Sequence, residues 1–104
     1  LYLSQPVEEA LIRIIQEALT NIRRHANANT ATISLSTHDN RLTLLITDDG
    51  RGLPPDPSRA GGLGLTNMRE RAEGVRGSFD VRPTRPGTII EVILPTDRAE
   101  PAHA

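Results

Sequence analysis

Several residue types are absent or scarce in this chain of 104 residues. The absence of cysteine excludes disulfides, thiolate zinc sites and cysteine nucleophiles. All 12 basic residues are arginine, so a P-loop NTPase and Schiff-base chemistry, which need lysine, are also excluded. Aromatic residues make up 2% of the chain and the net charge is −1, which argues against nucleic-acid binding. No apolar run approaches the roughly 18 residues of a membrane span, and we expect no membrane contact by this domain.

The length of the chain predicts one domain, which we place at residues 1–96. Helical spacing predicts a first helix over 6–28, with Ser4 or Gln5 at its start. Hairpins on both sides of a later helix then predict a two-layer α/β sandwich of the α+β class, with a mixed, mostly antiparallel sheet and helices on one face. The other expected elements are strands at 30–37, 41–48, 77–82 and 88–94, a loop at 53–62, a helix at 65–73 and a disordered tail at 97–104.

The stretch QEALTNIRRHA, residues 16–26, places polar side chains on an otherwise apolar helix. Glu17, Asn21 and Arg24 follow the spacing i, i+4 and i+7 and share one face of an α-helix, with His25 beside them. The ordinary interpretation is a solvated face with a Glu–Arg pair. The alternative is a ligand face, because carboxylate and carboxamide oxygens suit Mg²⁺ and arginine suits phosphate.

The stretch ITDDGRGL, residues 46–53, ends a predicted strand with acidic residues. Strand alternation places Asp48 on the core face, where a carboxylate needs a donor. Asp-Gly is a common turn signal, which explains Asp49 but neither an inward Asp48 nor the second glycine, Gly52. An exocyclic purine amine would be a suitable donor, and Thr88 has the same inward parity on the last strand.

The stretch GGLGLTNMRERA, residues 61–72, joins a glycine-rich loop to a helix start. Backbone amides at a helix start can bind an anion, although an ordinary flexible loop explains the glycines equally well. A dinucleotide fingerprint is a poor match, because position 67 is asparagine and the segment follows a loop.

In their order and spacing, these motifs resemble the ATP-binding catalytic domain of two-component sensor histidine kinases, over roughly residues 7–95. This is the Bergerat fold that gyrase, Hsp90 and MutL share. QEALTNIRRHA resembles the asparagine box of the family, DDGRG its D-x-G-x-G box and GLGL its G-x-G-L box. With MRERA, the set is similar to the kinases that pair with NarL/LuxR-type response regulators.

The resemblance implies Mg²⁺-ATP as the ligand, with Glu17 and Asn21 as the catalytic residues. Asn21 would ligate the metal and Glu17 would hold its water shell. Asp48 would accept a hydrogen bond from the adenine amino group, near Thr88. The other implied ATP-binding residues are Arg24 and His25 at the phosphates or ribose, Gly50 and Gly52 under the base, Gly62 and Gly64 in the lid, Leu65 and Met68 along the adenine pocket, and Leu53 and Leu63.

The resemblance also implies transfer of the γ-phosphoryl group to a histidine, in a cytoplasmic kinase that signals to a response regulator. The acceptor would lie on a dimerisation domain absent from this chain, so we do not expect the fragment to phosphorylate itself. His38 precedes an aspartate, as the acceptor usually does, but it lies in a predicted turn. The short lid, residues 53–62, lacks the phenylalanine box of many histidine kinases, as in the NarL-partner type.

Two other functions remain open at this point. An anti-sigma-factor serine kinase uses the same fold and ATP site on a protein serine. A non-catalytic nucleotide-binding interaction domain would bind ATP, or nothing, without transferring a phosphoryl group. The short lid and MRERA favour the histidine kinase over the first, whereas phosphoryl transfer to a supplied acceptor would discriminate it from the second.

Overall fold

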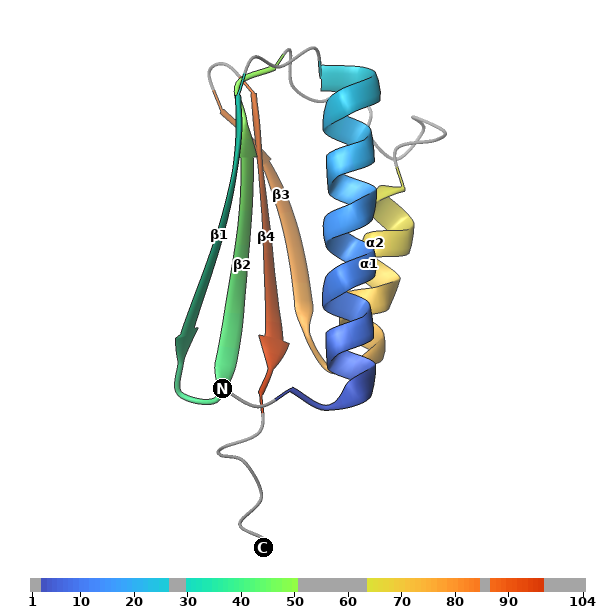
Figure 1. The fold of residues 1–104 in the computed structure, drawn as a ribbon, viewed down its shortest axis with the longest axis vertical. Helices are drawn as coiled ribbons and strands as arrows, with labels where there is room; N and C mark the ends of the chain where they lie inside the picture. The colour runs from blue at the N-terminus through green and yellow to red at the C-terminus, as the bar shows by residue number, and fades with distance from the viewer. Residues whose placement is uncertain (1–2, 27–29, 51–63, 85–86, 97–104) are drawn as a thin grey trace, which may run out of the picture.

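The computed structural model describes residues 3–26, 30–50, 64–84 and 87–96, with the side chains of 25 and 26 left out of the description. Two helices cover one face of a sheet, and none of the described helices lies on the other face (Figure 1). This arrangement confirms the predicted two-layer sandwich. The elements in chain order are α1 (Gln5–Asn21), the π-helical segment η1 (Ile22–Ala26), β1 (Ala31–His38), β2 (Arg41–Asp48), α2 (Leu65–Gly74), β3 (Ser78–Pro83) and β4 (Thr88–Pro95).

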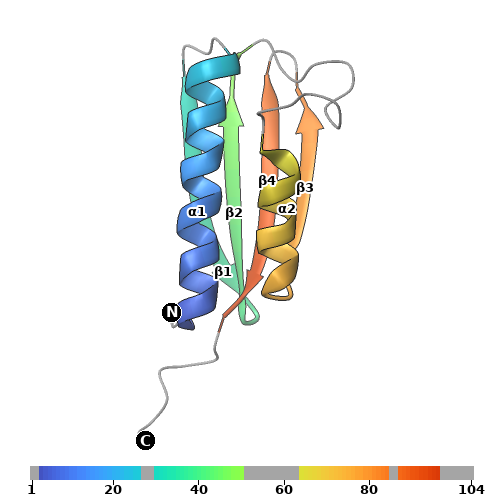
Figure 2. The ribbon, with the colours of Figure 1, turned by 90° about the vertical axis from the view of Figure 1, so that its right-hand side faces the viewer.

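The four described strands form one sheet in the order β1-β2-β4-β3. All three pairings are antiparallel, so the mixed character that we expected occurs in none of them. The β1–β2 hairpin turns at Asp39 and Asn40, whose φ values of 51° and 62° suit the turn types that match strand twist. Seen from the helical side, α1 and α2 lie side by side over the sheet (Figure 2).

The helix α1 begins where the sequence predicts and continues into a segment of another helix type. Ser4 caps it, because the Ser4 Oγ accepts a hydrogen bond of 3.4 Å from the Val7 N–H. The α-helical hydrogen bonding ends at Asn21, and the chain continues as the wider η1 turn rather than as α-helix to residue 28. Residues 22–26 are therefore helical as predicted but with π-helical rather than α-helical hydrogen bonding, and the predicted end near residue 28 lies outside the described part.

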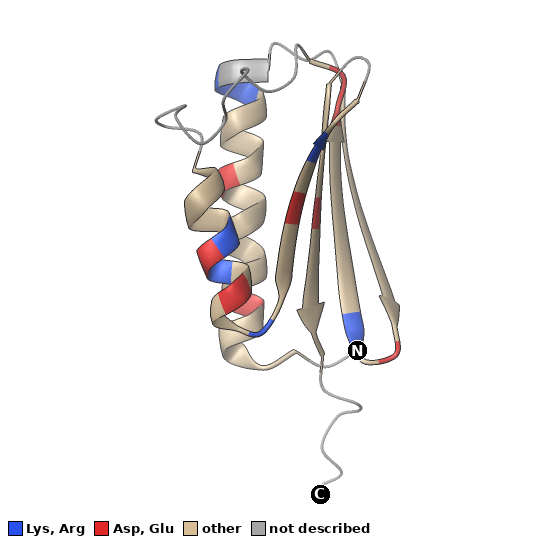
Figure 3. Cartoon of the chain, turned by 180° about the vertical axis from the view of Figure 1, so that it is seen from behind, with Lys and Arg blue, Asp and Glu red and all other residues tan. Residues whose placement is uncertain are grey.

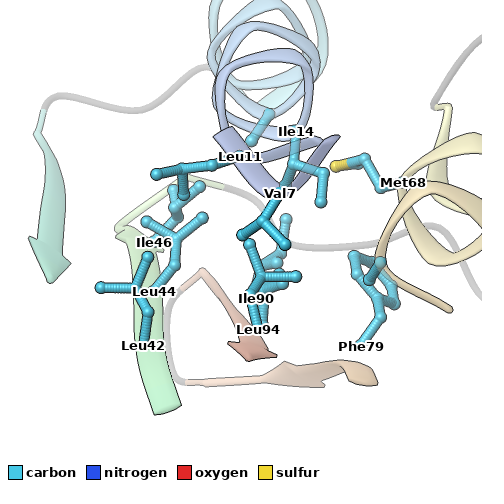
Figure 4. Close-up of a cluster of buried hydrophobic side chains, with 13 residues drawn as sticks. Val7, Leu11, Ile14, Leu42, Leu44, Ile46, Met68, Phe79, Ile90 and Leu94 are labelled. Atoms are coloured by element: carbon cyan, nitrogen blue, oxygen red, sulfur yellow. The ribbon is translucent and has the colours of Figure 1, made fainter. Parts of the chain in front are cut away.

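The hydrophobic core fills the space between the helices and the sheet (Figure 4). Cross-strand partners share a face, so the inner rows of the sheet can be read from the register. One such row contains Leu44, Val92 and Phe79. The core cluster consists of Val7, Leu11, Ile14 and Ala18 from α1, Met68 and Ala72 from α2, and Leu42, Leu44, Ile46, Phe79, Ile90, Val92 and Leu94 from the sheet.

The edge strand β1 has an apolar inner face that the described helices leave uncovered. Ile33 pairs with buried Ile46 and Leu35 with buried Leu44, so all four side chains point to the helical side. Nevertheless Ile33 is 40% exposed and Leu35 is 52% exposed. Alternation along this strand therefore predicts the orientation of its side chains but not their burial.

Charged residues of both signs are interspersed on the face shown in Figure 3. On α2, Arg69 reaches Glu73 at 4.0 Å, and on β3 Arg82 reaches Asp80 at 3.3 Å. Arg69 also lies over the Phe79 ring at 5.1 Å from its centroid, which ties α2 to β3. None of the helices in the described part of the chain is long and apolar enough to cross a membrane.

Candidate functional site

The inner face of the sheet changes from apolar to polar at the end where β2 finishes and β4 starts. The last inner row is Ala31, Asp48, Thr88 and Pro83, whereas the row before it contains Ile46 and Ile90. Asp48 is half-buried and Thr88 is only 6% exposed. The predicted inward parity of Asp48 and Thr88 is therefore confirmed, and the register makes them direct cross-strand partners.

Asp48 and its neighbour Asp49 make different hydrogen bonds. The Gly50 N–H donates to Asp48 Oδ1 at 2.9 Å, which holds the start of the turn against the carboxylate. The Thr30 N–H donates to Asp49 Oδ1 at 2.9 Å, and the Asp49 N–H donates back to the Thr30 carbonyl at 3.3 Å. Asp49 thus fastens the end of β2 to β1, while Asp48 stays on the helical side.

Above this row, the last turn of α1 brings two further predicted residues into place. Glu17 and Asn21 lie one turn apart on α1, and both side chains are half-buried. The Asn21 Oδ1 atom is buried. Arg24 is exposed and lies in η1, where each residue turns less around the axis than in an α-helix. The shared-face spacing therefore holds for Glu17 and Asn21 but does not extend to Arg24.

Glu17 also touches the start of α2. Gly64 is the N-cap of α2 in the left-handed conformation, with φ 68° and ψ 13°. A Cβ at Gly64 would lie 2.6 Å from Glu17 Cδ and 2.7 Å from Glu17 Cγ, so the Glu17 side chain occupies the space that a residue 64 side chain would fill. The Met68 N–H donates to the Gly64 carbonyl at 2.9 Å and begins the helix.

Two predicted lining residues follow Gly64 on α2. Leu65 is half-buried against the core. Met68 is fully buried with an exposed fraction of 0%, and Figure 4 shows it beside Ile14 in the core. Met68 therefore packs beneath this end of the molecule, as a core residue in the described structure.

The structure brings the predicted residues of three elements to one end of the sandwich. There α1 and β2 end and β4 begins, with the start of α2 beside them (Figures 1 and 2). Gly50 is buried at the same end. Among the described residues, no three His, Cys, Asp or Glu side chains form a metal-binding group. The predicted residues Gly52, Leu53, Gly62 and Leu63, and the side chain of His25, lie outside the described part.

The sequence analysis did not identify one residue at this site. Gly87 is buried directly before β4, with φ 109°. A Cβ there would lie 2.7 Å from the Asp48 carbonyl carbon and 3.0 Å from Asp49 Cα. The sequence signal was its place in Pro-Gly-Thr, immediately ahead of a strand with an inward threonine.

The fold and the motifs together define a class, the α/β-sandwich ATPase domains. Residues 7–98 match the family described as "Histidine kinase-, DNA gyrase B-, and HSP90-like ATPase". Because this match spans most of the chain, the chain belongs to that ATPase family. The expected membership of this ATPase family and the expected Bergerat fold are confirmed, as is ATP as the ligand at the level of the family.

Among named relatives, the chain is similar to the signal transduction histidine-protein kinase/phosphatase UhpB of Salmonella typhimurium, with 45% identity over 93 residues. It is 39% identical over 94 residues to the sensor histidine kinase LiaS of Bacillus subtilis. These matches cover 89% of this chain in both cases, but only 18% of UhpB and 26% of LiaS. The chain thus spans about a fifth to a quarter of the length of these curated relatives.

Solved structures show the same architecture. The blue-light activated histidine kinase of Erythrobacter litoralis EL346 superposes with a TM-score of 0.73 at 26% identity, over 89% of this chain and 31% of that chain. The ATP binding domain of PrrB from Mycobacterium tuberculosis has a TM-score of 0.73 at 21% identity, over 86% of this chain and 68% of that chain. The second likeness supports the fold alone.

Proposed function

We propose that this chain is the ATP-binding catalytic domain of a sensor histidine kinase, comprising residues 1–96. It would transfer the γ-phosphoryl group to a histidine on a dimerisation domain of the same parent kinase, which then signals to a response regulator. The observation on which the proposal depends is that the inward pair Asp48 and Thr88 lies at the same end of the molecule as the Glu17–Asn21 turn of α1. One nucleotide could then contact both groups.

The Asp48 side is suited to the adenine base. Its carboxylate lies at the end of an apolar inner face, where a hydrogen bond from an exocyclic amine would compensate its partial desolvation. Thr88, the direct partner of Asp48, would orient the base or a water beside it. Gly50 is buried next to Asp48 and, with Gly52, would let the backbone lie close to a flat ring. Leu53, Leu63 and Leu65 would supply apolar contacts around the base, with Met68 beneath it.

The α1–α2 side is suited to the phosphates. Asn21 would ligate Mg²⁺ through its carboxamide oxygen, and Glu17 would hold water around the metal. A protein that offers few ligands fits Mg²⁺, which takes its remaining oxygens from phosphates and water. The cap residue of α2, Gly64, has no side chain, so it leaves the amides of the first turn to face an anion. Arg24 and His25, with Gly62, would complete the phosphate contacts.

The reaction itself needs mainly positioning and charge neutralisation. The bond between the γ-phosphorus and the β–γ bridging oxygen breaks, ADP leaves with that electron pair, and an imidazole nitrogen forms the new bond to phosphorus. Mg²⁺ would offset the phosphate charge. Asp48 and Asn21 would each fix an opposite end of ATP, so that the γ-phosphoryl group is presented to the acceptor.

The alternatives receive less support. The named relatives are histidine kinases, which favours phosphoryl transfer to histidine over an anti-sigma-factor serine kinase and over a non-catalytic binding domain. We further propose a NarL/LuxR-type response regulator as the partner, on the motif resemblance. The parent kinase would hold this domain in the cytoplasm.

The test is calorimetric titration of the chain with ATP, with and without magnesium. We expect the parent to bind ATP and magnesium to strengthen that binding. Asn21→Ala should abolish the magnesium dependence while adenine selectivity persists. Gln16→Ala, an exposed change on the same helix, is the matched control and should bind as the parent does. If Asn21→Ala keeps the full magnesium effect, the metal assignment is wrong.

Asp48→Asn tests the opposite end of the ligand. Converting the carboxylate to an amide removes its negative charge and replaces one of its two acceptor oxygens with an NH2 donor, so affinity for ATP should fall by about tenfold or more and selectivity over GTP should shrink. Asp49→Asn is the control, because its carboxylate bonds Thr30 instead. Equal losses of selectivity in both variants would contradict the assignment of Asp48 to the base.

A further inference from the structure

The backbone of Gly87 packs closely against the backbone of Asp48 and Asp49. It is buried, its φ is 109°, and its carbonyl accepts a hydrogen bond of 3.0 Å from the Thr84 N–H. An L-residue rarely adopts this φ. Any Cβ would also overlap the Asp48 carbonyl group. Two independent constraints, backbone conformation and space, thus require glycine at this position.

The group that occupies this space is the backbone that orients Asp48. Asp48 pairs with Thr88, the residue after Gly87, and its Oδ1 accepts from the Gly50 N–H at 2.9 Å. The Asp48–Asp49 peptide therefore packs on Gly87 while the Asp48 carboxylate is fastened to the following turn. A Cβ at residue 87 would displace that peptide, and the Asp48 carboxylate would rotate with it.

We propose that Gly87 is a positioning residue for base recognition: its missing side chain lets the Asp48–Asp49 backbone seat against the start of β4 and so sets the direction of the Asp48 carboxylate. This inference rests on the proposed function, because it presumes that Asp48 receives the adenine amino group. Gly87 itself need not touch the nucleotide.

Two other glycines allow a matched experiment. Gly77 also lacks room for a side chain, because a Cβ there would lie 2.7 Å from Leu94 Cδ2 and 3.0 Å from the Ala72 carbonyl oxygen. It directly precedes β3, whose first residue Ser78 pairs with Ile93, whereas Asp48 pairs with Thr88 at the other end of β4. The start of β3 and the end of β2 lie at opposite ends of the sheet (Figure 1). A Cβ at Gly74 would meet no described atom within 4 Å, so Gly74 controls for the change of residue type alone.

The experiment compares ATP with GTP binding by calorimetry in the parent and in the three alanine variants, with thermal unfolding followed for each. Gly87→Ala and Gly77→Ala should both lower the melting temperature. Only Gly87→Ala should also reduce the preference for ATP over GTP, by about tenfold, the effect of one misplaced hydrogen bond to a charged group. Gly74→Ala should leave the preference unchanged. If Gly87→Ala unfolds in buffer, all variants are measured in sucrose, which favours the compact state.

A double-mutant cycle separates positioning from general damage. In an Asp48→Asn background, Gly87→Ala should change the ATP/GTP preference no further, because it acts through the carboxylate that is already gone. An unchanged preference in folded Gly87→Ala, or equal loss in Gly77→Ala, would overturn the role of Gly87. A parent that shows no preference for ATP would instead overturn the proposed function, and the role of Gly87 with it.

Discussion

At the scale of single residues, the candidate site depends on polar side chains and on glycines at positions that have no room for a side chain. Asp48 and Asp49 are adjacent in sequence, yet alternation turns one toward the helices while the other bonds Thr30. Gly64 and Gly87 are the two described glycines with positive φ, and each lies against a proposed ligand-binding acid, Glu17 or Asp48. Both acids are thus held by close contact with a backbone, which is how a small domain can fix a functional group.

Gly64→Ala tests this contact at the α2 start. A left-handed alanine costs about 1–2 kcal/mol, and its methyl group would displace the Glu17 side chain. We therefore expect the free energy of unfolding in urea to fall by at least that amount. In a Glu17→Ala background part of the loss should vanish, because the overlap is removed and only the backbone cost remains.

The control for this prediction is Gly74→Ala, which meets open space near the end of α2. It should be neutral or stabilise by up to about 1 kcal/mol, since alanine favours helix over glycine. Identical losses for Gly64→Ala with and without Glu17 would show that the two residues do not interact.

At the scale of elements, much of the fold follows from periodicity. The order of helices and strands, the hairpin turn at Asp39–Asn40 and the inward parity of Asp48 and Thr88 were all predictable, because each depends on local spacing. The change to a π-helix after Asn21 was not, because a π-helical turn keeps a helix-like apolar pattern while changing the hydrogen bonding.

Other features depend on contacts between segments that are distant in sequence. Met68 belongs to the buried core cluster, where α2 packs against α1. The proposed role of Gly87 depends on its close contact with the backbone of Asp48, which lies on the neighbouring strand. Spacing within a segment contains no information about either contact. The sequence could therefore predict the inward orientation of Asp48 and Thr88 but not the packing contacts that support them.

The strand pair β1–β2 provides a prediction at this scale. Leu35 and Leu44 are cross-strand partners on one face, with exposed fractions of 52% and 0%. Leu44→Ala should lower the free energy of unfolding by about 2–5 kcal/mol through lost burial and the cavity it leaves. Leu35→Ala should lower it by less than about 1 kcal/mol, because most of that side chain already meets water. Urea unfolding measures both, and equal losses would mean that another element covers β1.

At the scale of the whole molecule, the candidate site joins the two layers. Glu17 and Asn21 belong to the helical layer, whereas Asp48 and Thr88 belong to the sheet. A nucleotide that contacts both layers binds only when they are packed together, so it should stabilise the folded state as a unit. This coupling distinguishes a ligand that spans the proposed site from one held by the helical end alone.

Thermal unfolding with added ligand measures this coupling. At ATP concentrations about 100 times the dissociation constant, the folded state should gain about 2.7 kcal/mol, which for a domain of this size raises the melting temperature by roughly 10–20 °C. Inorganic triphosphate, which lacks the base, should stabilise the parent less than ATP does at equal concentration. Asp48→Asn should remove most of the advantage of ATP over triphosphate, because that difference comes from the sheet layer. If ATP and triphosphate stabilise the parent equally, the base makes no contact with Asp48 and the nucleotide is bound at its phosphate end only.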